Sequence, residues 1–131
     1  MKTFNGDVNL KQKLLEEIKK HEKADAILQG TYGQGLGEEW KGCAIGCSLR
    51  SLNIIKEAKE IDKNTNYHSR YEEELGIPRI IAKLEDRLFE NMSVKDSKKW
   101  PHQFMEAIPV SADLSMVWPK FLHWLLVDKK D

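Results

Sequence analysis

The feature that most constrains the fold is an apolar repeat of helical period in the second half of the chain. Positions three and four residues apart share one face of an α-helix, so the repeat predicts an amphipathic helix with one buried face. Pro78 stands where a helix favours a first-turn proline. Glu85 falls at the edge of the apolar face, and Asp86 is predicted to point away from it. The repeating residues are Ile77, Ile80, Ile81, Leu84, Leu88 and Met92.

A first helix is predicted over residues 8–29. Asp7 or Asn9 is placed to cap its start, and Gly30 is placed to end it. His21 and Asp25 lie one turn apart on the same face as the apolar residues, so both are expected to point inward. The apolar residues of that face are Leu10, Leu14, Ile18 and Leu28.

Weaker signals predict the remaining helices. Ser51 is placed to cap a helix over 51–61, and Ser69 and Glu72 have the spacing of a capping box for a short helix ended by Gly76. Another helix is predicted over 97–108, and Trp118-Pro119 opens a last one, which is apolar enough that we expect it to pack on the others.

Residues 30–46 contain six of the eight glycines, interleaved with aromatic and apolar residues. That mixture favours short strands joined by a flexible loop, so we predict a β-hairpin. Its tip, residues 33–39, lacks the lysine followed by Ser or Thr that a phosphate-binding P-loop requires.

Composition sets the outer limits. The 131 residues are 40% hydrophobic, enough for one domain with a core, and the 21 basic side chains balance the 21 acidic ones. We therefore predict a mainly α, single-domain helical bundle over residues 1–131 with one small β-hairpin. No net charge draws it to nucleic acid or to a membrane surface, and no apolar run approaches the ~20 residues of a membrane span. A signal peptide is not evident, so a cytoplasmic location with reduced thiols is expected.

Both cysteines, Cys43 and Cys47, lie in the glycine-bracketed segment 41–48. A thiol nucleophile needs a base to deprotonate it and a carboxylate to orient that base, and His21 and Asp25 supply those residue types. Cys43, Cys47, His21 and Asp25 are thus the candidate catalytic residues. The opposing interpretation is that His21 and Asp25 are a buried polar pair whose hydrogen bonds are made within the protein and have no catalytic role.

Three other interpretations of the thiols stay open. A zinc site would use both cysteines and His21, with Glu85 or Asp25 as fourth ligand, but the cysteine spacing is unusual for zinc and there is no second pair, so we predict neither metal nor other cofactor. A disulfide would need a bend, because residues i and i+4 of an extended strand are ~13 Å apart and a bridge needs about 7 Å or less between Cα atoms. Packing of both thiols in the core is the preferred interpretation.

Candidate binding residues cluster around the glycine-rich segment. Tyr32, Leu36 and Trp40 lie within it, and Trp40 is a candidate anchor for a partner protein. Glu85 is a candidate acid or base, although pairing with Arg79, Lys83 or His102 is the preferred interpretation. Tyr67 and His68 are predicted to lie in a loop.

Five segments carry a resemblance to a family of small uncharacterised proteins scattered through bacterial and phage genomes. That family also has a histidine and an aspartate in its first helix, matched here by His21 and Asp25. The resemblance spans about residues 18–127, interrupted by an insertion over 51–66, and it implies no reaction. A phage or mobile-element setting would imply an accessory or anti-defence role. The five segments are 41–47 (KGCAIGC), 71–78 (YEEELGIP), 84–86 (LED), 100–101 (WP) and 121–126 (FLHWLL).

Together these features lead us to expect a small cytosolic, non-enzymatic binding or regulatory protein with a protein partner. The alternative is a cysteine-dependent hydrolase or transferase using Cys43 or Cys47 with His21 and Asp25. The sequence does not indicate an oligomeric state.

Overall fold

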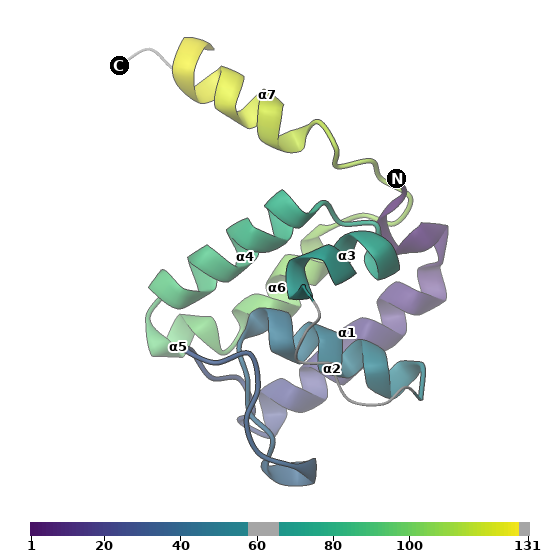
Figure 1. The fold of residues 1–131 in the computed structure, drawn as a ribbon, viewed down its shortest axis with the longest axis vertical. Coiled ribbons are helices and arrows are strands. Elements are labelled where there is room, and N and C mark those ends of the chain that lie inside the picture. The colour runs from purple at the N-terminus through teal and green to yellow at the C-terminus, as the bar shows by residue number, and fades with distance from the viewer. Residues whose placement is uncertain (58–65, 129–131) are drawn as a thin grey trace.

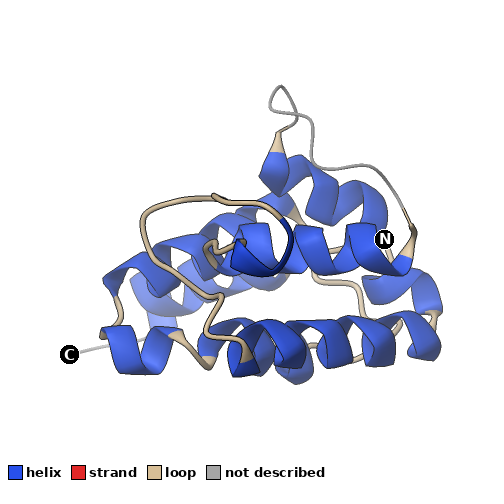
Figure 2. Cartoon of the chain, turned by 90° about the horizontal axis from the view of Figure 1, so that it is seen from below, coloured by secondary structure: helices blue, strands red, loops and turns tan. Residues whose placement is uncertain are grey.

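The computed structural model describes residues 1–57 and 66–128, and this part of the chain is mainly helical, as predicted. Figure 1 shows the helices, and Figure 2 shows helices and loops with no strand in the described residues. Two short 3₁₀ helices, η1 (Thr3–Gly6) and η2 (Gly37–Glu39), and a π-helical segment, η3 (Trp124–Asp128), accompany them. The helices are α1 (Val8–Lys23), α2 (Ala44–Ile55), α3 (Tyr67–Leu75), α4 (Arg79–Asn91), α5 (Val94–Ser97), α6 (Trp100–Ala107) and α7 (Val117–His123).

Helix α2 is the centre of the fold. It contacts α1, α3, α4 and α6, and its residues 44–49 and 51–53 are all buried. A helix that is buried on nearly every side belongs to the core rather than to the surface. Because α2 contains Cys47 and begins directly after Cys43, the cysteine segment lies at the centre of the protein.

The predicted hairpin is absent from the described residues. Residues 30–42 form a loop with two isolated bridges, a parallel one between Ile27 and Gly42 and an antiparallel one between Gln34 and Lys41. A Cβ atom at Gly46 would lie 1.6 Å from the Tyr32 carbonyl oxygen, and one at Gly42 would lie 2.5 Å from it. Gly42 and Gly46 therefore let the loop backbone lie directly against the start of α2, so these two glycines serve close packing and not strands.

The start of α2 also corrects the prediction that Ser51 caps a helix. Cys43 is the N-cap, and its sulfur accepts a hydrogen bond from the Gly46 N–H at 3.5 Å. Ser51 lies buried inside the helix, which ends at Ile55. The predicted end near residue 61 lies outside the described residues.

Helix α1 begins where the sequence predicts and ends earlier. The Asp7 carboxylate accepts hydrogen bonds from the N–H groups of Asn9 and Leu10, at 2.9 and 3.2 Å. The helix stops at Lys23, and Asp25 has a left-handed backbone with φ of 53°. Asp25 consequently lies beyond the helix and not on its buried face.

Helices α3 and α4 agree more closely with the sequence. Gly76 ends α3 in the left-handed conformation, with φ of 64°, and α4 follows directly after Pro78. The N-cap of α3 is Asn66, whose side chain accepts the Ser69 N–H, so Tyr67 and His68 belong to the first turn of the helix and not to a loop.

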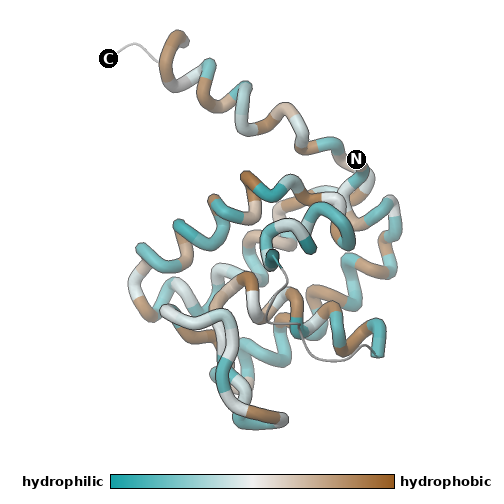
Figure 3. The backbone as a smooth tube through the Cα atoms, viewed as in Figure 1, coloured by the Kyte–Doolittle hydropathy of each residue, from teal (hydrophilic) through white to brown (hydrophobic). Residues whose placement is uncertain are grey.

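Helix α7 departs from the prediction that the last helix packs on the others. It extends away from the helices that surround α2 (Figure 1), and apolar residues recur along it (Figure 3). Trp118 rests against the core, whereas Phe121 is 45% exposed. Across residues 1–57 and 66–128, no helix has the length and apolar character that crossing a membrane demands.

Candidate functional site

His21 is buried, as predicted, and its partners belong to the protein scaffold. Its Nδ1 atom lies 2.8 Å from the Glu17 carbonyl oxygen, which can only accept, so Nδ1 carries the proton. Ser51 Oγ lies 3.2 Å from the same nitrogen, and the edge of the ring meets Trp40. Burial lowers the pKa of the imidazole below its usual value. These contacts hold His21 as a neutral link between α1, α2 and the glycine-rich loop.

The structure does not bring Asp25 to His21. The Asp25 side chain is 73% exposed and lies 3.2 Å from the Lys98 ammonium. The predicted arrangement of thiol, imidazole and carboxylate is therefore not assembled, because α1 ends at Lys23, two residues before Asp25.

Cys43 and Cys47 are buried free thiols, one helical turn apart rather than in an extended strand. Burial raises the pKa of the Cys43 thiol to about 12 and that of Cys47 further still. A thiol attacks as its thiolate, so both groups are poor nucleophiles in this environment. Within the described part of the chain, no cluster of three His, Cys, Asp or Glu side chains is suited to a metal ion.

Glu85 is fully buried and corrects the prediction of an edge carboxylate paired with a cation. Its Oε1 atom accepts a hydrogen bond from the Tyr71 hydroxyl at 2.7 Å. Arg79 pairs instead with Glu72, and His102 with Glu106. Burial raises the pKa of the Glu85 carboxyl to about 8.

The position of Glu85 on α4 explains its burial. It lies four residues after Ile81 and four before Phe89, both of which are buried, so the three share one face of the helix. This spacing was present in the sequence and is the signal that would have placed Glu85 in the core.

Asp86, predicted to point away, joins a half-buried polar and aromatic cluster instead. Its Oδ2 atom accepts hydrogen bonds from the Tyr32 hydroxyl at 3.3 Å and from His68 Nε2 at 3.2 Å. The Tyr32 ring stacks on Tyr67, with ring centroids 4.4 Å apart. Nothing in the sequence pairs these residues, because they come from the loop, α3 and α4.

The other candidate binding residues divide into two kinds. Trp40 is half-buried, with the Arg50 guanidinium 4.9 Å from its ring centroid and His21 at its edge, so it supports the loop. Leu36, in contrast, is 74% exposed. Leu36 is therefore the candidate binding residue that the loop presents to solvent.

Comparison of the chain with protein-family models, with curated proteins and with solved structures finds no match in any of the three.

Proposed function

We propose that the protein is a small non-enzymatic binding or regulatory protein that contacts a partner protein through the outer end of its glycine-rich loop, residues 33–39. The observation that carries the proposal is the exposure of Leu36 on a loop that is otherwise fixed to the protein by specific contacts. An apolar side chain held in this way is suited to fill a pocket on a partner.

The loop is held at several points. Gln34 and Lys41 exchange two backbone hydrogen bonds, of 2.8 and 2.9 Å. The Arg50 guanidinium donates to the Gly37 carbonyl oxygen at 3.0 Å and also lies over Trp40. A loop that is already ordered loses less conformational entropy on binding, which favours affinity.

The charge around Leu36 indicates what kind of partner fits. Glu38 and Glu39 are exposed and form the turn η2 directly after it. The complementary surface is an apolar pocket with basic side chains at its rim, because opposite charges at an interface favour the correct partner and speed association.

The cysteine-dependent hydrolase or transferase is the weaker proposal. It needs an accessible thiolate beside a base that a carboxylate orients, and both thiols are buried with raised pKa values while Asp25 pairs with Lys98 and not with His21. An accessory or anti-defence role in a phage or mobile element is part of the binding proposal and rests on the sequence resemblance alone.

The test compares Leu36→Asp with Val94→Asp, a matched change at an exposed apolar residue of α5. Each immobilised protein is incubated with an extract of the cells that encode it, and the retained proteins are quantified by mass spectrometry. We expect a partner retained by the wild type and by Val94→Asp, and reduced at least about tenfold by Leu36→Asp, the loss that about 1.4 kcal/mol produces.

Circular dichroism and thermal unfolding establish that both variants stay folded. Trp40 is a poor site for this test, because its contacts with His21 and Arg50 support the loop itself. Equal retention by all three proteins, or no retained protein at all, would contradict the proposal.

A further inference from the structure

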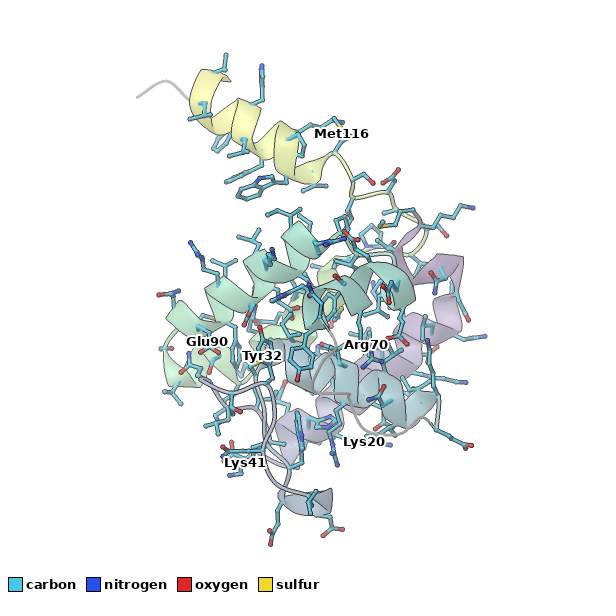
Figure 4. The ribbon with its side chains drawn as sticks, in the orientation of Figure 1. Lys20, Tyr32, Lys41, Arg70, Glu90 and Met116 are labelled. Carbon is cyan, nitrogen blue, oxygen red and sulfur yellow. The ribbon has the colours of Figure 1, made fainter. Side chains whose placement is uncertain are left out.

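The C-terminal part of the chain carries apolar surface that the fold leaves in water. Helix α7 and the segment η3 after it project beyond the helices that surround α2, and Met116, just before α7, lies outside them as well (Figure 4). Exposed apolar side chains that are scattered singly are ordinary, whereas a contiguous set of them marks an interaction surface. The exposed apolar side chains of this part are Met116, Val117, Phe121, Trp124, Leu126 and Val127.

A second exposed apolar face lies on α4. Ile80 and Leu88 are 38% and 42% exposed, and Leu84, midway between them, is half-buried. Residues four apart share one face of a helix, so these three side chains form a stripe along α4. Lys83 and Arg87 are exposed, each one position before a leucine of the stripe. The α4 stripe therefore combines aliphatic side chains with cations along one edge.

The face of α7 matches the α4 stripe in length and in chemistry. Val117, Phe121 and Trp124 stand at positions i, i+4 and i+7, so they share one side of α7. At about 1.5 Å of rise per residue, this face and the α4 stripe are each about 10–12 Å long. The rings of Phe121 and Trp124, with centroids 6.0 Å apart, are suited to pack on aliphatic side chains and to attract cations to their faces. The α4 stripe offers both.

The segment before α7 is fastened to the protein, which keeps α7 off the α4 stripe of its own chain. The Thr3 N–H donates to the Ala112 carbonyl oxygen at 2.8 Å, and the Ser111 N–H donates to the Thr3 carbonyl oxygen at 3.2 Å. The Asp113 carboxylate then accepts the Ser115 N–H at 2.9 Å. These bonds fix the direction in which α7 leaves the protein, and the α4 stripe stays exposed in the single chain.

We propose that two copies of the chain form a symmetric dimer in which the α7 of each copy covers the α4 stripe of the other. Because each copy carries both faces, the same contact occurs twice about a two-fold axis. A large aromatic side chain buries about 150–250 Å² in full, so the half-exposed rings of Phe121 and Trp124 still offer about 100 Å² each.

Twice this contact, with the aliphatic side chains of both faces included, comes to about 1,000 Å², the least that a specific interface needs. An interface of this size supports a weak dimer with a dissociation constant of about 10 µM or more, so the single chain predominates in dilute solution. The tip of the glycine-rich loop, residues 33–39, lies at the end of the molecule opposite α7 (Figure 1). The dimer is therefore independent of the proposed partner contact at Leu36.

The test is sedimentation equilibrium of the full chain from about 1 to about 300 µM, a range that brackets a dissociation constant of about 10 µM. We expect the average mass to rise from one chain toward two. Phe121→Asp and Leu88→Asp should each weaken association at least tenfold, because each places a carboxylate in an apolar contact. Val94→Asp, at an exposed apolar residue of α5, should associate as the wild type does. Circular dichroism shows which variants are folded, and Ile80→Asp replaces Leu88→Asp if the latter is not.

Mixing the two variants establishes which faces meet. In a mixed dimer, the unaltered α7 of the Leu88→Asp chain meets the unaltered α4 stripe of the Phe121→Asp chain, so one of the two contacts is restored. The mixture should therefore associate at least about threefold more tightly than either variant alone. A mass of one chain at every concentration of the wild type would overturn the proposal. A mixture that associates no more tightly than its components would overturn it as well, because α7 then does not meet the α4 stripe of another copy.

Discussion

A carboxyl group with no exposed surface exchanges its hydration for contacts within the protein, and the contact found at Glu85 is the Tyr71 hydroxyl at 2.7 Å. Besides burial, the groups that act on the pKa of Glu85 are Tyr71, whose hydrogen bond lowers it, and Asp86, whose charge raises it, and no basic side chain is among them. The cost of burial therefore falls on the ionised form.

This cost predicts how stability depends on pH. Glu85 has a pKa of about 8 in the folded state against 4.5 for an ordinary glutamate, so the unfolded state loses its proton first. Stability should fall as pH rises from about 4.5 to about 8, by up to about 1.4 kcal/mol per pH unit from this group. His21 has the opposite effect, because burial lowers the pKa of its imidazole below 6.5. Below that pH the unfolded state binds the proton more readily, so the His21 contribution to stability falls as pH falls.

The variant Glu85→Gln isolates the contribution of Glu85. The difference in unfolding free energy between wild type and variant, measured in urea at pH 5 and pH 7.5, should shift by several kcal/mol against the wild type at the higher pH. Glu73→Gln, at an exposed position of α3, is the control. If the difference between wild type and Glu85→Gln is the same at both pH values, Glu85 is ionised in the folded protein.

At the scale of elements, the sequence predicted helices well where periodicity and caps agree. Asp7 starts α1, Gly76 ends α3 and Pro78 precedes α4, because each acts through local backbone geometry. The start of α2 was missed because glycines suit both turns and close packing, and which one applies at Gly42 and Gly46 depends on where Tyr32 lies in space.

In the candidate site, too, features set by local spacing could be predicted from the sequence, whereas contacts between distant elements could not. Burial of His21 was predictable from the apolar face of α1, and burial of Glu85 was available from its spacing to Ile81 and Phe89. The Glu85–Tyr71 and Asp86–Tyr32 hydrogen bonds join different elements, so no local sequence pattern predicts them. Asp25 was misplaced because the chain leaves α1 at Lys23 without a proline or glycine to mark the end.

The packing of the loop on α2 gives a prediction for Gly46→Ala. A Cβ there would lie 1.6 Å from the Tyr32 carbonyl oxygen, so the loop must move. We expect a loss of about 1–3 kcal/mol in unfolding free energy, together with changed NMR chemical shifts at Tyr32 and Trp40. Gly37→Ala is the control, because its Cβ meets no atom within 4 Å and it bears only the strain of a positive φ, about 1 kcal/mol. An equal loss in both variants would contradict close packing at Gly46.

At the scale of the whole molecule, the apolar residues are divided between the core around α2 and the projecting helix α7. Phe89 is fully buried in that core, whereas Phe121 stacks between Trp118 and Trp124 and is 45% exposed. Phenylalanine at these two positions should therefore contribute very differently to folding, because the energy of an apolar side chain follows the area it removes from water.

Phe89→Ser should cost about 3–5 kcal/mol in unfolding free energy, because it leaves a cavity and places a hydroxyl in the core. Phe121→Ser should cost less than about 1 kcal/mol, since the side chain of Phe121 is 45% exposed to water. Urea unfolding followed by far-UV circular dichroism measures both. Comparable losses in the two variants would mean that α7 packs on the helices around α2 in solution, in which case Phe121 belongs to the same cooperative core as Phe89.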